Sequence, residues 1–151
     1  EGQFKIVGEE YQSVSKSHSS FKQKHPLVAA SYNLKKRLEG KYEIENLIDE
    51  WLKAWSDRDI TRYGKFYANN FRSQNMNLRS WLKYKEQLNR KYNFINVSKD
   101  KLVIKKSKKR VEVSFLQTYK SNAFKAVGIK QLILVREKGL WKIYRETWKK
   151  L

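Results

Sequence analysis

The sequence predicts an α+β fold in which helices come first and an antiparallel sheet follows. Three observations support this prediction. Apolar residues recur with helical spacing over residues 44–92, the period changes to two after Asn93, and short turns join the later segments. Helices and strands that are segregated along a chain are typical of α+β proteins. With 151 residues, of which 40% are hydrophobic, the chain has the length of one domain.

The first 40 residues are predicted to be an arm or linker, and the main domain spans residues 41–151. Residues 11–25 are rich in Ser and Lys and contain few large aliphatic side chains. Pro26 follows, and proline suits the first turn of a helix. We predict that this helix covers residues 26–39 and stops at Gly40.

Three helices are predicted at the start of the main domain. The first has one apolar stripe with 3.6-residue spacing, formed by Ile44, Leu47, Ile48, Trp51, Leu52 and Trp55. Asp57 and Asp59 precede the second helix, which we expect to end near residues 68–70. Their spacing suits N-capping better than a catalytic pair of carboxylates. The third helix is capped by Asn75 or Asn77.

About four antiparallel strands follow these helices. Alternating apolar residues predict strands that begin near Ile95 and Val111, and a third strand over residues 125–137. Lys138-Gly139 then turns the chain into a last strand over residues 140–148. We expect a strongly curved sheet that wraps against the helices.

The composition excludes several kinds of site. Because the chain has no Cys, it has no disulfide, no thiol nucleophile and no Cys-based metal site. Its two His, His18 and His25, lie close together in the arm without further metal ligands, so we expect no metal and no cofactor. No apolar run reaches the roughly 18 residues of a transmembrane helix.

The positive charge is concentrated in the second half of the chain. The formal net charge is +19, and residues 76–151 hold 21 basic and five acidic residues. The densest basic run is a candidate polyanion site formed by Lys105, Lys106, Lys108, Lys109 and Arg110. Such a turn can bind an anionic polymer or keep a sheet edge soluble. Nucleic acid is the weaker candidate partner, because no nucleic-acid recognition motif accompanies the charge.

Two segments resemble NTF2-like (SnoaL-like) domains. They read Trp51-Leu52-Lys53-Ala54-Trp55-Ser56-Asp57-Arg58-Asp59-Ile60 and Phe66-Tyr67-Ala68-Asn69-Asn70-Phe71. The resemblance covers residues 41–151 and implies a cone of three helices on a strongly bent sheet, with a pocket at its mouth. It also implies a homodimer through the open sheet face, for which the candidates are Tyr119, Ile133, Tyr144 and Trp148.

A narrower resemblance is to the C-terminal NTF2-like domain attached to L,D-transpeptidase-like murein enzymes, including the L,D-carboxypeptidases that determine cell shape. It lies in Phe71–Trp81, Tyr84-Lys85, Leu88–Arg90 and Ile95–Ser98. In those enzymes a separate domain with a Cys nucleophile and a His is catalytic, so this chain would lack that activity. The resemblance implies a periplasmic or cell-envelope location, and a cytoplasmic one is the alternative. The first residue, Glu1, is not Met, which suggests a processed protein or a fragment.

The implied ligand is peptidoglycan or an associated glycan. We expect it in an aromatic pocket formed by Trp51, Trp55, Tyr63, Tyr67, Phe71, Arg72, Gln74, Asn75, Trp81 and Tyr84. The alternative for these aromatic residues is packing in the core.

Ketosteroid isomerases provide the enzymatic comparison. By resemblance, their catalytic base would fall at Asn75 and their helix-1 Tyr at Trp51, and neither residue here suits that chemistry. No ionisable pair is visible inside the cone. The sequence therefore predicts a non-catalytic binding module, and the alternatives are a sequence-independent nucleic-acid-binding protein or a small-molecule NTF2-like enzyme.

Overall fold

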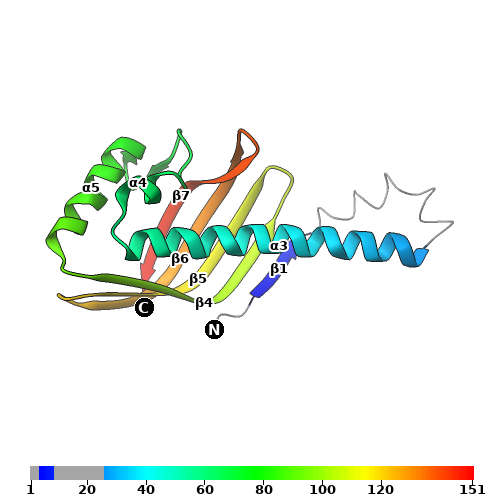
Figure 1. The fold of residues 1–151 in the computed structure, drawn as a ribbon, viewed down its shortest axis with the longest axis horizontal. Helices are drawn as coiled ribbons and strands as arrows, with labels where there is room; N and C mark the ends of the chain where they lie inside the picture. Colours follow the sequence, from blue (N-terminus) through cyan, green and yellow to red (C-terminus); the bar gives the residue numbers. More distant parts are fainter. Residues whose placement is uncertain (1–3, 9–25) are drawn as a thin grey trace.

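The computed structural model describes residues 4–8 and 26–151, and these residues form the expected α+β fold. Helices lie over one face of a curved sheet (Figure 1). The helices are α3 (Pro26–Ser56), α4 (Ile60–Gly64) and α5 (Leu78–Lys91). The strands are β1 (Phe4–Gly8), β2 (Arg72–Ser73), β3 (Met76–Asn77), β4 (Ile95–Lys106), β5 (Arg110–Ser121), β6 (Lys125–Glu137) and β7 (Leu140–Lys150). No helix in these ranges is long and apolar enough to cross a membrane.

One continuous helix, α3, replaces the two helices that the sequence predicted on either side of Gly40. The predicted stop at Gly40 is wrong. A glycine ends a helix where it adopts a positive φ, and among the described glycines only Gly139 does so. Leu38, Glu39 and Lys41 surround Gly40 with good helix formers, which offset its cost of about 1 kcal/mol. As a result, α3 extends beyond the sheet (Figure 1).

Helix α4 is shorter than predicted, since it does not reach residues 68–70. Its N-cap is Asp59, one of several candidates in the sequence, and the Asp59 side chain accepts a hydrogen bond from the Arg62 N–H at 3.1 Å. After the helix, the chain turns so that Tyr67 forms an isolated bridge with Ile143 of β7. This turn positions the Tyr67 side chain over the sheet.

The N-cap of α5 is Asn77, one of the two candidates. The Asn77 side chain accepts from the Ser80 N–H at 3.0 Å, and the Ser80 hydroxyl accepts from the Asn77 N–H at 3.1 Å. Asn75 instead belongs to a tight turn between β2 and β3, where Gln74 and Asn75 have φ of 51° and 62°. Positive φ at both central residues is the requirement of a type I′ hairpin turn.

The main sheet has the order β1-β4-β5-β6-β7. The four antiparallel strands were predicted, whereas β1, which pairs in parallel with β4 at the edge, was assigned to the arm. Two irregularities bend the long strands. One lies in β4 between Asp100 and Val103, and the other in β7, where Tyr144 is an extra residue between Ile143 and Arg145. Bulges of this kind increase curvature and twist.

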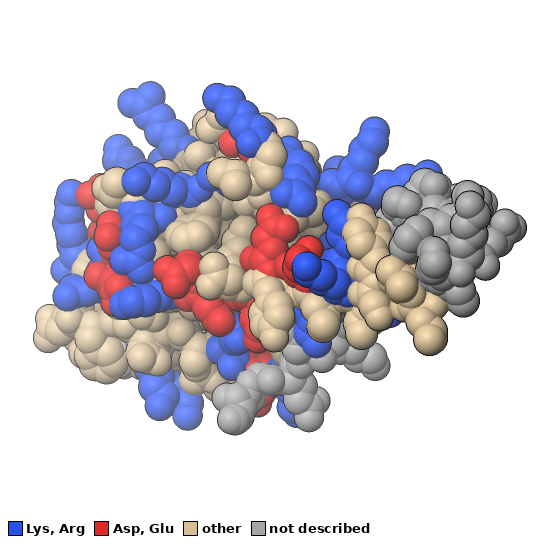
Figure 2. Space-filling model, turned by 45° about the vertical axis from the view of Figure 1, so that its right-hand side comes forward, with Lys and Arg blue, Asp and Glu red and all other residues tan. Residues whose placement is uncertain are grey.

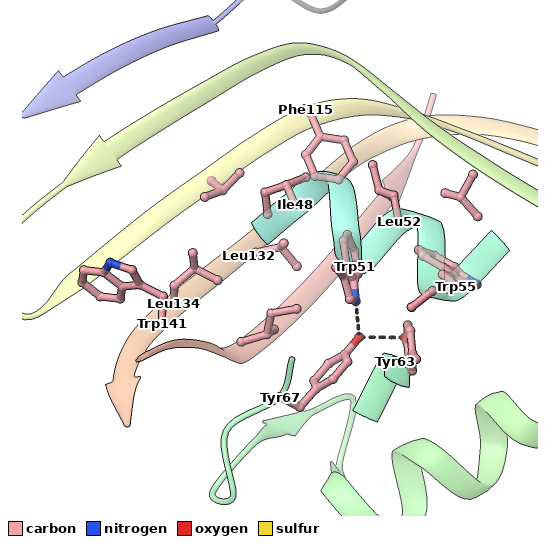
Figure 3. Packing of buried hydrophobic residues seen from close by; sticks show 14 of the residues in the cluster. Ile48, Trp51, Leu52, Trp55, Tyr63, Tyr67, Phe115, Leu132, Leu134 and Trp141 are labelled. Atoms are coloured by element: carbon pink, nitrogen blue, oxygen red, sulfur yellow. Dashed lines mark hydrogen bonds between the residues drawn. The ribbon is translucent and has the colours of Figure 1, made fainter. Parts of the chain in front are cut away.

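The core lies between the second half of α3 and the inner face of the sheet (Figure 3). Trp51 is fully buried, and its ring meets the Phe115 ring of β5 edge to face at 6.4 Å. Leu132 and Leu134 of β6 face the same interior. The helices do not cover the whole inner face, and a cleft remains at one end of the sheet.

Candidate functional site

A cleft of about 300 Å³ opens where α5 and the end of α3 meet one end of the sheet. Its walls come from every layer of the domain: α3, α5, the β2–β3 turn and the four antiparallel strands. Seven lining residues are aromatic: Trp55, Trp81, Tyr84, Tyr92, Tyr119, Phe124 and Trp148. The polar and charged ones are Gln74, Lys85, Gln117 and Lys130, and the aliphatic ones are Leu88, Ile95 and Ala126. An aromatic cleft with a few converging polar groups is typical of a ligand site.

Four of the ten predicted pocket residues line this cleft: Trp55, Gln74, Trp81 and Tyr84. The prediction is wrong for four other aromatic residues, which do not line the cleft and pack in the core behind it: Trp51, Tyr63, Tyr67 and Phe71. For these four, core packing, the alternative, is the correct interpretation. The prediction is also wrong for Arg72 and Asn75, whose side chains are exposed beside the cleft and do not line it.

An ordered chain of hydrogen bonds lies behind the cleft. The Trp51 indole N–H donates to the Tyr67 hydroxyl at 3.1 Å, and the hydroxyls of Tyr67 and Tyr63 are 2.7 Å apart (Figure 3). The Tyr67 hydroxyl donates its proton to Oε1 of Glu146 at 2.6 Å. Tyr63 must therefore donate to Tyr67, and it accepts from the Trp81 indole at 3.3 Å. Each buried donor and acceptor in this chain has a partner.

Glu146 is the acceptor at the end of this chain, and it is also half of a buried ion pair. Lys130 Nζ lies 2.6 Å from Glu146 Oε2, and the two side chains are 5% and 0% exposed. Burial alone would raise the pKa of Glu146, but the charges of Lys130 and Lys85 and the hydrogen bonds from Lys130 and Tyr67 hold the pKa of that carboxyl below its ordinary value. Glu146 is therefore an ionised structural group.

This pair corrects the expectation that the cone holds no ionisable pair. Lys130 carried a usable signal, because it lies two residues before Leu132 on the inward face of β6. The sequence contained no such signal for Glu146. Strict alternation from Ile143 would point Glu146 outward, and only the extra residue Tyr144 returns it to the interior.

Lys85 is the second cation of the cleft. Its Nζ lies 4.4 Å from the centroid of the Trp55 ring and 5.0 Å from that of Trp81. Burial, together with the charge of Lys130, lowers the pKa of Lys85 to about 8, although Glu146 opposes the shift. No carboxylate of the described chain forms an ion pair with it. Lys85 lies in the second segment of the narrower resemblance, but its role there was not predicted.

Gln117 supplies an unpaired polar atom. Its side chain comes from β5, lines the cleft and is 3% exposed. Its Oε1 atom is buried without a hydrogen-bond partner. Such an atom costs free energy unless something in the cleft donates to it.

The predicted polyanion site lies away from this cleft. Its five residues lie in the turn between β4 and β5 and at the adjoining strand ends, whereas the cleft lies at the opposite end of those strands, next to Ile95 and Tyr119. The Arg110 guanidinium stacks on the Tyr144 ring at 5.6 Å. Polyanion binding by this turn stays a prediction.

The proposed dimer face needs one correction. Tyr119 and Trp148 point inward and line the cleft, so they do not belong to the outer face of the sheet. Ile133 does lie there, in a hollow of about 450 Å³ that it shares with Val103, Gln131 and Arg145. His18 and His25 lie outside the described residues. Within the described ranges, no group of three or more His, Asp or Glu side chains is arranged to hold a metal ion.

Comparison with known proteins identifies the fold family. Residues 43–147 match the sequence model of the Cds6 C-terminal NTF2-like domain. The chain belongs to this family. Membership of this NTF2-like family accounts for the helices packed on a bent antiparallel sheet. A comparison with curated proteins finds no match.

Solved structures share this NTF2-like fold. Bd1075 of Bdellovibrio bacteriovorus is 28% identical with a TM-score of 0.70, over 74% of this chain and 40% of that one. An NTF2-like protein of unknown function from Pseudomonas putida KT2440 is 17% identical with a TM-score of 0.67, over 74% and 87%. The helical cell shape determining protein Pgp2 of Campylobacter jejuni is 21% identical with a TM-score of 0.59, over 67% and 38%. The chain thus spans about two fifths of Bd1075 and Pgp2.

Proposed function

We propose that this NTF2-like domain is a non-catalytic binding module of a cell-envelope protein, and that its cleft holds peptidoglycan or an associated glycan. The observation that carries the proposal is the cleft itself, in which Trp55, Trp81 and Trp148 present aromatic surface beside two lysines. Aromatic faces suit sugar rings and peptide planes, and the polar groups orient them.

The relatives support this reading at the level of the whole protein. Pgp2 is a helical cell shape determining protein, and peptidoglycan is the polymer that maintains bacterial cell shape. This chain corresponds to less than half of Pgp2 and of Bd1075. We therefore propose that the domain accompanies a separate murein-processing domain, in the periplasm or cell envelope, and holds that domain close to the wall.

The geometry of Glu146 favours binding over catalysis. A general acid or base must come within hydrogen-bond distance of the substrate, directly or through one water. Glu146 is 0% exposed, lies behind Lys130 and already accepts from Tyr67. A ligand in the cleft would meet the lysine ammonium groups and not this carboxylate.

Co-sedimentation with protein-free peptidoglycan sacculi tests the proposal. The salt concentration is about 150 mM, so that exposed charges are screened over roughly 8 Å. We expect the sacculi to retain the wild-type protein. The variants Tyr84→Ala and Trp148→Ala alter the cleft wall and should no longer sediment with the sacculi. Tyr42→Ala is the matched control, because Tyr42 is 68% exposed on α3 and does not line the cleft. Equal retention of all four proteins would refute the cleft as the binding site.

A parallel titration with duplex and single-stranded DNA tests the nucleic-acid alternative. Charge-driven binding to DNA weakens steeply with salt, whereas stacking in the cleft does not. If sacculi are ignored and DNA binds with a steep salt slope, the murein proposal is wrong and the basic second half of the chain is the functional surface.

A further inference from the structure

We propose that the cleft recognises the free carboxyl terminus of a peptide, with the terminal carboxylate at the ammonium group of Lys85 and the last peptide N–H donated to Oε1 of Gln117. This inference rests on the proposed function, because the stem peptides are the part of peptidoglycan that ends in free carboxylates. It names the chemical group that the module holds.

The charges in the cleft select a monoanion. Lys130 is already neutralised by Glu146 at 2.6 Å, and this pair is buried. Lys85 forms no ion pair with a described carboxylate, and its Nζ lies 4.4 to 6.0 Å from the ring centroids of Trp55, Trp81 and Tyr84. The cleft and its immediate lining therefore carry one positive charge without an opposite charge. A single carboxylate compensates that charge, whereas a neutral sugar ring does not.

The unpaired oxygen of Gln117 adds a second requirement. A carboxylate has no proton to give to Oε1, so the group that approaches Gln117 must be an N–H or O–H donor. The chain end of a peptide combines the two features, because the amide N–H of its last residue lies next to the carboxylate. The same pair of groups satisfies both Lys85 and Gln117, which line one cleft.

The walls fit the rest of such a chain end. Ala126 leaves space on the β6 side, while Tyr119 and Phe124 stack at 5.4 Å on the side of β5 and the turn that follows it. The volume of about 300 Å³ lies at the small end of the usual range for ligand sites. A short chain end with a small side chain fits that space, and the preceding peptide planes would lie along the aromatic rim.

The test compares N-acetyl-D-Ala-D-Ala as the free acid with the same dipeptide as its C-terminal amide. Binding is followed on the full chain through the indole N–H signals of Trp55, Trp81 and Trp148. We expect the amide to bind at least about tenfold more weakly, since a hydrogen bond to a charged group is lost. Equal dissociation constants for the acid and the amide would overturn the inference.

Variants assign the preference to the two side chains. Lys85→Met should remove the preference for the acid, and Lys85→Arg should retain it. Lys83→Met is the matched control, because Lys83 lies exposed on the same helix and does not line the cleft. Gln117→Leu should weaken the binding of the acid and of the amide by a similar factor, because it removes only the oxygen that accepts the peptide N–H. Retention of the preference in Lys85→Met, in a variant whose indole spectrum is otherwise unchanged, would refute the assignment to Lys85.

The sacculus assay separates this inference from the proposed function. If sacculi retain the protein but the acid and amide bind equally, the domain binds murein through another group, and only the inference falls. If the acid is preferred but sacculi are not retained, the carboxylate site stands and the murein assignment falls. If neither sacculi nor dipeptide binds, both fall.

Discussion

At the residue scale, the ion pair of Lys130 and Glu146 joins the wall of the cleft to the core. Glu146 holds the Tyr67 hydroxyl on one oxygen and the Lys130 ammonium on the other. Lys130 in turn lies 5.2 Å from the centroid of the Trp55 ring and 5.9 Å from that of Trp148. Both aromatic walls therefore lie against a lysine that is held by a fully buried carboxylate.

The cost of breaking this pair is the first prediction. Lys130→Met leaves the Glu146 carboxylate charged in the interior without its partner, and it should lower the free energy of unfolding by about 3–5 kcal/mol. The double variant Lys130→Met, Glu146→Gln removes the stranded charge and should recover part of that loss. Urea denaturation followed by Trp fluorescence measures both. A double variant that is no more stable than the single one would contradict this account of the pair.

Lys85 should make stability depend on pH. Its pKa is about 8 in the folded protein, against an ordinary value of 10.5. Between these values the unfolded chain binds more protons, so stability rises with pH, by at most roughly 3 kcal/mol. In Lys85→Met this contribution is absent. The free energy of unfolding of the wild type, relative to that of the variant, should therefore increase from pH 8 to pH 10. Parallel pH profiles of the two proteins would show that the pKa of Lys85 is not lowered.

At the element scale, the pairing of β6 with β7 sets the wall that carries Trp148. Gly128 pairs with Lys150, and a Cβ atom at Gly128 would lie 2.4 Å from the Lys149 carbonyl oxygen and 2.7 Å from the Trp148 ring. Only glycine allows the two strands and the indole to approach this closely. The glycine is thus a packing requirement of the cleft.

Gly128→Ala should therefore destabilise the domain by about 1–3 kcal/mol and shift the Trp148 indole signal. Gly64→Ala is the matched control. There the new Cβ atom would meet only the Leu82 side chain, at 3.0 Å, and a flexible side chain can move. Thermal unfolding of both variants provides the comparison, and equal melting temperatures would argue against close strand approach at Gly128.

At the scale of the whole molecule, the charge is unevenly distributed. Seven of the 15 acidic residues lie in residues 26–59, the segment that contains α3. Figure 2 shows the acidic side chains in a band across the middle of one face, with Lys and Arg around it. The excess of basic residues therefore belongs mainly to the sheet and to α5.

Reversing charge in the β4–β5 turn tests whether this excess has a function. Lys108→Glu with Lys109→Glu should reduce the salt slope of DNA binding by roughly 2 or more and leave sacculus retention unchanged, because the turn is remote from the cleft. Both residues are exposed, so folding should be unaffected. Loss of sacculus retention in this variant would locate murein binding at the turn.

A homodimer through the outer face of the sheet remains a proposal for the whole molecule. Ile133 lies in the hollow of that face, and Ile133→Glu would replace an apolar side chain of the proposed contact by a charged one. If the dimer exists, this change should raise its dissociation constant at least about tenfold, as measured by sedimentation equilibrium. A wild type that is monomeric at millimolar concentration would rule the dimer out.

The sequence alone determined the order of helices and strands in the main domain and its four antiparallel strands, because helical and strand periodicity are local properties that each segment carries in its own residues. Asp59 and Asn77 as candidate N-caps and the α+β class follow from such local patterns. The family also followed from local motifs.

The site was decided by the tertiary structure. Aromatic residues of the core and of the cleft look alike in sequence, so Trp51 and Trp55 were placed together, although only Trp55 reaches the cleft. Glu146 faces the interior because a bulge at Tyr144 changes the alternation of β7, and Lys85 acquires its role from rings on α3 and α5. These features depend on contacts between residues far apart in the chain, which no local period encodes.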